Sequence, residues 1–178
     1  LLQNAGFETT GSWTSSVAPL NRTSTRKFGS YSHAVTGDPS TSKQLSQTIY
    51  SNFEAGTQFV ISGWAKANSV DTSALGRVFG IRVLVHYQGS LHESFYYEFN
   101  PNNPNWQFMS EIVTPTANYN FDSIIVYLCY DNNVNTAYFD NISLTEEPAQ
   151  TYKYDEKGKK LEPMELVYID VPDEFSGT

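Results

Sequence analysis

Apolar and polar residues alternate in short runs along the first 145 positions of the chain, most clearly in residues 79–88. The odd positions of this run are all apolar, whereas Arg82 and His86 occupy even positions. Successive side chains of a β-strand point to opposite faces of a sheet, so the run predicts a strand with one buried and one outward face. Residues 92–100 alternate in the same way after a polar turn, which predicts a β-hairpin.

The same period recurs along the body of the chain, and no segment has the 3.6-residue period of an amphipathic helix. The predicted strands are residues 44–50, 57–67, 79–88, 92–100, 106–115, 123–131 and 137–144. Aromatic and β-branched residues fill these runs, and Gly, Ser, Thr and Asn separate them. We therefore predict an all-β fold, a two-sheet antiparallel β-sandwich, with a β-barrel as the alternative.

Charge divides the chain near Pro148. Residues 1–145 contain 10 acidic and 7 basic residues, whereas the last 33 contain 9 acidic and 4 basic ones. Since proline cannot continue a strand ladder, we predict a domain over residues 1–148 and an acidic tail or linker over 149–178. The net charge of −8 argues against nucleic acid as a partner, and no run is long and apolar enough to insert into a membrane.

Two acidic residues lie beside apolar strand positions, Asp140 in "YFDNISL" and Glu8 in "NAGFETT". Burying a carboxylate is costly unless a partner compensates its charge. The first and last strands of a sandwich are often neighbours, so Glu8 and Asp140 could share a Ca²⁺ ion, which prefers oxygen ligands. The alternative is two separate carboxylates, each capped by backbone N–H groups.

An ordered set of motifs runs through residues 3–145: "NAGFE…GSW", "RKFGSYSHAV", "KQLSQTIY", "FVISGWAKA" and "YFDNISL". The set resembles the jelly-roll carbohydrate-binding modules of the family 4, 9 and 22 type. This resemblance implies a β-jelly roll with a structural Ca²⁺ and a sugar site on a concave sheet. It also implies that Glu8 and Asp140 bind the ion through carboxylates, and that Lys27 does so through its backbone carbonyl.

A sugar site needs flat rings for C–H faces and polar side chains for hydroxyl groups. Outward strand positions supply both kinds, and we expect them to form one patch. The candidate ligand-binding residues are Trp64, Arg82, His86, Tyr96, Glu98, Tyr127 and Asp131, together with Trp106 in a loop rich in Pro and Asn. Trp64 could instead pack into the core, and Trp106 could instead plug one end of the sandwich.

The sequence favours a protein without catalytic activity. A glycosidase needs two opposed carboxylates, and no acidic pair is distinguished by its context. We expect Arg82 beside Glu98, where it would favour the ionised carboxylate and make Glu98 a poor general acid. The single cysteine, Cys129, lies in an apolar strand, which predicts an inert buried thiol.

The tail segment "TYKYDEKGKKLE" (151–162) resembles one unit of the Tyr-Asp repeats in bacterial Rhs-like, wall-associated proteins. That resemblance implies a module of a larger, multidomain protein that is extracellular or at the cell surface. A linker is the alternative. The predicted function is a non-catalytic module that targets this larger protein to a polysaccharide or surface glycan. The alternative is a structural or protein-adhesion sandwich without a sugar site.

Overall fold

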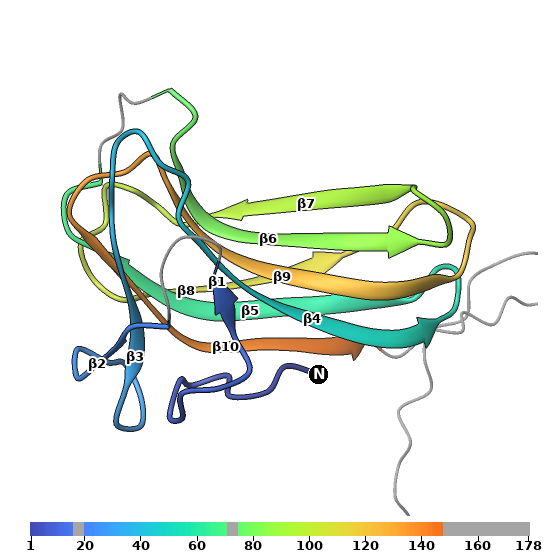
Figure 1. Cartoon of the computed structure of the whole chain (residues 1–178), viewed down its shortest axis with the longest axis horizontal. Helices are drawn as coiled ribbons and strands as arrows, with labels where there is room; N and C mark the ends of the chain where they lie inside the picture. The colour runs from blue at the N-terminus through green and yellow to red at the C-terminus, as the bar shows by residue number, and fades with distance from the viewer. Residues whose placement is uncertain (16–19, 71–74, 148–178) are drawn as a thin grey trace, which may run out of the picture. The chain divides into compact units, whose positions relative to one another are not determined.

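The computed structural model describes residues 1–15, 20–70 and 75–147, which form ten β-strands. Figure 1 shows the strands with their labels. Their bounds are β1 (Thr14–Ser15), β2 (Arg22–Thr23), β3 (Ser32–Thr36), β4 (Gln44–Phe53), β5 (Gln58–Ala67), β6 (Val78–Tyr87), β7 (His92–Glu98), β8 (Gln107–Val113), β9 (Phe121–Asp131) and β10 (Thr136–Glu147). All seven predicted strands are present. The three others, β1 to β3, have two to five residues, too few for an alternation to stand out.

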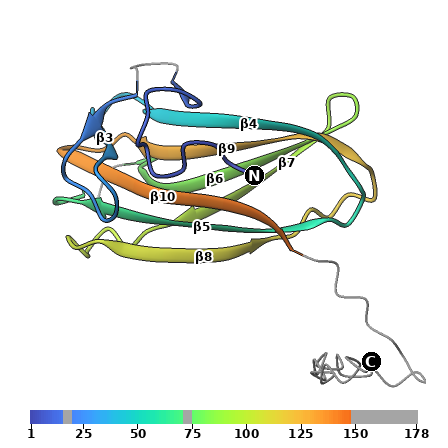
Figure 2. The same ribbon diagram turned by 90° about the horizontal axis from the view of Figure 1, so that it is seen from below.

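The strands form two antiparallel sheets of five strands each, which matches a jelly-roll β-sandwich. Sheet A has the order β1-β4-β9-β6-β7, and sheet B has the order β2-β3-β10-β5-β8. In Figure 2, β10, β5 and β8 of sheet B follow one another downward, and β4, β9, β6 and β7 of sheet A are labelled above them. The predicted all-β sandwich is confirmed.

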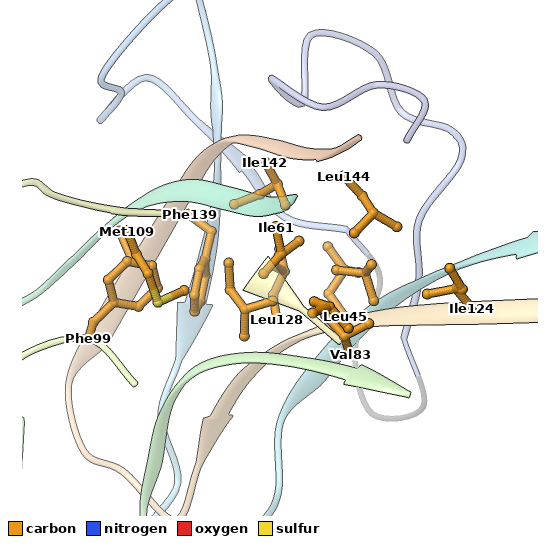
Figure 3. Close-up of a cluster of buried hydrophobic side chains, with 14 of the residues drawn as sticks. Leu45, Ile61, Val83, Phe99, Met109, Ile124, Leu128, Phe139, Ile142 and Leu144 are labelled. Carbon is orange, nitrogen blue, oxygen red and sulfur yellow. The ribbon is translucent and has the colours of Figure 1, made fainter. Parts of the chain in front are cut away.

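The hydrophobic core lies between the two sheets and is made by the inward residue of each alternating pair. Figure 3 shows Leu45, Val83 and Leu128 of sheet A and Ile61, Phe139 and Ile142 of sheet B. Each of these six side chains is at most 1% exposed. In β6 the odd positions are buried and Arg82, Leu84 and His86 are partly exposed, so the predicted faces of this strand are correct.

The N-terminal residues run beside β10, where the strand is irregular. The β10–β5 register shifts between Asp140 and Ser143, and Asn141 has a positive φ of 49°. At this bulge the Ile142 amide donates to the Ala5 carbonyl at 3.0 Å, and the Leu1 ammonium donates to the Leu144 carbonyl at 2.8 Å. The two ends of the domain are thereby joined.

Nothing in residues 1–15, 20–70 and 75–147 is a helix of membrane-spanning length and apolarity. The predicted boundary at Pro148 and the segment over residues 151–162 lie outside the described residues.

Candidate functional site

The outer face of sheet A brings an arginine between two tyrosines. Ladder pairing places Tyr127 of β9 and Tyr96 of β7 on either side of Arg82 in β6. The guanidinium carbon of Arg82 lies 4.0 Å from the centroid of the Tyr127 ring and 5.8 Å from that of Tyr96. A guanidinium within about 6 Å of an aromatic face is attracted by the ring electrons. Cation–π contacts thus hold Arg82 in the middle of the sheet, with Tyr96 56% exposed beside it.

A hydrogen-bonded chain orients the same guanidinium from the β4 side. Arg82 Nη2 donates to Gln44 Oε1 at 3.2 Å, and Gln44 Nε2 donates to Asp131 Oδ2 at 2.7 Å. Asp131 is 6% exposed, and this burial raises its pKa. Asp131 therefore positions Gln44 and Arg82 from below the surface.

Gln44 was not among the predicted site residues, although a signal for it was present. It alternates with Leu45, whose side chain is buried, so it shares the outward face with Ser46. Strand pairing places Gln44 beside Cys129, and Cys129 beside Gly80. The Cys129 thiol is buried as predicted, and burial raises its pKa to about 12, which leaves it protonated and inert.

Glu98 does not contact Arg82, contrary to the prediction. It pairs with Gly80 in the ladder, and its carboxylate lies 3.7 Å from Arg77 Nη2. Arg77 lies just before β6, where the sequence showed no alternation that would assign it to a face. Tyr96, and not Glu98, is the β7 residue opposite Arg82, so the predicted neighbour of Arg82 was wrong.

His86 lies on the same outer face, four residues along β6 from Arg82. It is opposite His92 in the ladder, and the two rings are 6.0 Å apart. Among the described residues, no group of three or more His, Cys, Asp or Glu side chains could hold a metal ion, so no third such residue joins this histidine pair in a site.

The two candidate tryptophans, Trp64 and Trp106, lie on or next to strands of sheet B and are not part of this patch. Trp64 lies on β5 with Phe108 of β8 opposite it, and their rings are 5.2 Å apart. Trp106 precedes β8, and its ring is 6.5 Å from Tyr138 of β10. Alternation separates inner from outer positions but does not say which sheet a strand joins, so the prediction of a single patch was wrong for Trp64 and Trp106.

The carboxylates of Glu8 and Asp140 both accept hydrogen bonds from the segment over residues 26–31. Asp140 Oδ2 accepts from the amides of Lys27 (2.7 Å) and Phe28 (2.9 Å). Glu8 Oε1 accepts from the amides of Ser30 (2.8 Å) and Tyr31 (3.2 Å). One short segment thus supplies the N–H donors for both carboxylates.

Asp140 also has an oxygen that suits a cation. Its side chain is 1% exposed, and Oδ1 has no hydrogen-bond partner among the described residues. Burial raises the pKa of Asp140, and the Glu8 charge adds slightly to this, whereas hydrogen bonds from the Phe28, Lys27 and Asn141 amides act in the opposite direction. Two carboxylates with a free buried oxygen fit Ca²⁺, provided that backbone oxygens complete the ligand set. Lys27 contributes its amide N–H here, and its carbonyl stays a predicted ligand.

No protein-family model matches the chain, and neither does any curated protein. Solved structures do match. A family 16 carbohydrate-binding module has a TM-score of 0.60 and 19% identity, over 82% of this chain and 99% of the module. A family 22 xylan-binding domain from Paenibacillus barcinonensis has a TM-score of 0.57 and 14% identity, over 79% and 90% of the two chains. The chain has the fold of these modules.

The same fold also occurs in proteins with other titles. A cyclase from Fischerella sp. TAU has a TM-score of 0.59 and 18% identity, over 85% of this chain and 98% of the cyclase. The enzymatically active domain of tailspike protein 4 from bacteriophage CBA120 has a TM-score of 0.60 and 15% identity, over 82% of this chain. The chain spans only 21% of that tailspike domain. At these identities the likeness shows the fold alone, and function depends on the site.

Proposed function

We propose that the domain is a non-catalytic carbohydrate-binding module whose sugar site is the outer face of sheet A. The observation that carries the proposal is the placement of Arg82 between Tyr127 and Tyr96, with Gln44 as a further hydrogen-bonding group. Tyrosine rings can pack against sugar C–H faces, while guanidinium and amide groups bind hydroxyl oxygens. Because Asp131 and the rings fix Arg82 in advance, little side-chain entropy is lost when a sugar binds.

The fold supports the same proposal, since several proteins that share it are carbohydrate-binding modules by title, including a xylan-binding domain. We extend the proposal to location: the module targets a larger extracellular or cell-surface protein to a polysaccharide or surface glycan. The resemblance of the tail to a Tyr-Asp repeat unit supports this extension.

We also propose that Glu8 and Asp140 bind a structural Ca²⁺ ion. The buried Asp140 Oδ1 without a partner supports the site, and so does the closeness of two like charges that a cation would neutralise. The ion would supply positive charge between the N-terminal segment and β10. It would play no part in binding sugar on sheet A.

The sugar site is tested by glycan-array screening of the purified protein, followed by titration of the best glycan with variants. Arg82→Ala and Tyr127→Ala should each weaken binding by about tenfold or more, because each removes a contact worth roughly 1.5–3 kcal/mol. Tyr119→Ala is the matched control, since Tyr119 is a 63% exposed aromatic residue outside the strands of sheet A. Unchanged binding in folded Arg82 and Tyr127 variants would refute the site.

One arrangement favours an enzyme as the second candidate. Glu98 and Glu111 both line an open groove between the edge strands β7 and β8. Glu98, however, is paired with Arg77, and among the described residues Glu98 and Glu111 are not held by any further group that would make one of them an acid and the other a base. The same protein should therefore release no reducing ends from the polysaccharide that it binds. If reducing ends are released by the wild type and not by Glu98→Gln, the protein is an enzyme and the module proposal is wrong. If the protein binds no glycan, the structural or adhesion alternative is favoured.

A further inference from the structure

A second aromatic surface lies on the outer face of sheet B, on the opposite side of the sandwich from Arg82. It consists of Lys27, Trp64, Lys66, Trp106, Phe108 and Tyr138, which we call the Lys66 platform. The residues come from β5, β8, β10, the position just before β8 and the 26–31 segment. Aromatic and cationic side chains thus gather from separate parts of the chain onto one face.

Lys66 lies at the centre of one row of this platform. Tyr138 of β10 is its partner in the ladder, and Ala65, next to it, pairs with Gln107, next to Trp106. The rings of Tyr138 and Trp106 are 6.5 Å apart although β5 separates their strands. The two rings therefore lean toward each other across β5, the strand that carries Lys66.

The next row is formed by Trp64 and Phe108. Phe108 is 55% exposed, and its ring is tilted by 42° to that of Trp64. The ammonium group of Lys27 lies 4.3 Å from the centroid of the Trp64 ring, and Phe28 packs its edge against the same indole. Since Lys27 and Phe28 flank this indole, Phe108 is the ring of this row that is most open to a ligand.

No carboxylate of the described residues lies within 4.0 Å of the ammonium groups of the platform. The one ion pair among the described residues joins Arg77 and Glu98, so neither Lys27 nor Lys66 has a carboxylate within 4.0 Å there. Asp140 is the nearest acid in the ladder, opposite Trp64, but it is buried and accepts the amides of Lys27 and Phe28. An exposed ring beside unpaired ammonium groups is complementary to a ligand that is both flat-faced and anionic.

We propose that the Lys66 platform binds a polysaccharide of uronic acids. Phe108 and Trp106 would pack against the sugar rings, and the ammonium groups of Lys66 and Lys27 would pair with the carboxylates. The net charge of −8 does not prevent this, because at physiological salt charges more than about 8 Å away are largely screened. This site lies on sheet B, whereas the sugar site of the proposed function lies on sheet A. Either proposal can therefore be refuted without affecting the other.

The test is affinity electrophoresis of the whole protein in gels that contain polygalacturonate. The protein should be retarded, and Lys66→Gln and Phe108→Ala should each raise the apparent Kd by about tenfold. Two controls match these variants. Ile112→Ala removes another exposed apolar residue of β8, 58% exposed, that lies outside the platform. Arg82→Ala alters the opposite sheet, and neither control should change the retardation.

Highly methyl-esterified polygalacturonate separates charge from stacking, because it has the same backbone without most of the carboxylates. Retardation should be largely lost in that gel and should fall with added salt in the polygalacturonate gel. Three results would overturn the proposal: no retardation of the wild type, equal retardation by the esterified polymer, or loss of retardation in Arg82→Ala. The last result would place the acidic glycan on sheet A. Melting curves of Lys66→Gln and Phe108→Ala should match the wild type, since both residues lie on the outer face.

Discussion

His33 is a buried titratable residue that takes no part in either proposed site. Its side chain is 4% exposed and packs against Phe7, with ring centroids 5.7 Å apart. Its Nδ1 accepts the Asn21 amide at 3.3 Å. Burial lowers the pKa of His33 from 6.5 to about 4, so the folded protein keeps the imidazole neutral at a pH where the unfolded chain would protonate it.

This shift predicts a loss of stability in acid. Above pH 6.5 the neutral His33 does not reduce the free energy of unfolding. As the pH falls from 6.5 to 4, proton uptake by the unfolded chain lowers this free energy by about 3 kcal/mol in total. Buried Asp131 and Asp140 act in the opposite sense, because their raised pKa values favour the folded state as the pH falls toward 3.8. Urea unfolding of the wild type and His33→Gln from pH 7 to 4 isolates the histidine, since glutamine can still accept the Asn21 amide. Parallel stability curves for the two proteins would contradict the prediction.

At the scale of elements, the short segment over residues 26–31 holds two carboxylates from distant parts of the chain. Gly29 makes this approach possible. It has a φ of +58°, and a Cβ at this position would overlap Glu8 Oε1. A residue with a side chain would therefore have to adopt an unfavourable backbone conformation. Its Cβ would also collide with the Glu8 carboxylate, which accepts from the Ser30 and Tyr31 amides.

Gly29→Ala should accordingly destabilise the domain more than Gly56→Ala. Gly56 has a φ of +82° with open space around its Cα, so alanine there suffers the backbone strain alone. The displaced Glu8 would leave amide donors without their acceptor, which costs roughly 1 kcal/mol or more beyond that strain. Chemical unfolding of both variants measures the difference. Equal losses would show that Glu8 rearranges freely and does not cap the segment.

The elements also show what sequence alone could and could not reveal. Period-two alternation correctly divides β6 into buried and outward residues, because packing on one face constrains every second position. Strand pairing is not local: Arg82 and Tyr127 meet although 45 residues separate them. For that reason Trp64 was assigned to the wrong face of the molecule, and Gln44 was overlooked as the residue that links Arg82 to Asp131.

At the scale of the whole domain, the Glu8–Asp140 region joins the beginning of the described chain to its last strand. Hydrogen bonds from Leu1 to Leu144 and from Ile142 to Ala5 already fasten these ends. A calcium ion at Asp140 Oδ1 would add a contact that only the folded state can make. A ligand that binds only the folded state raises the melting temperature.

Chelation should therefore lower the melting temperature of the wild type, and calcium should restore it. Asp140→Asn keeps the shape of the side chain and should remove this sensitivity, whereas Glu54→Ala, which alters an exposed acid, should retain it. Elemental analysis of the purified protein gives an independent measure of bound calcium. An unchanged melting curve together with a metal-free protein would leave Glu8 and Asp140 as carboxylates capped by backbone amides alone.

The back-to-back arrangement of the two sheets has a consequence for the polysaccharides that the domain would bind. Packed sheets are about 10 Å apart, and the outer faces point in opposite directions. A strand of polymer lying on Tyr96 and Tyr127 is then separated by the full thickness of the domain from one lying on Phe108 and Trp106. With both faces occupied, a single copy would crosslink two polymer strands, and a solution of the polysaccharides that it binds should become more viscous as the protein is added.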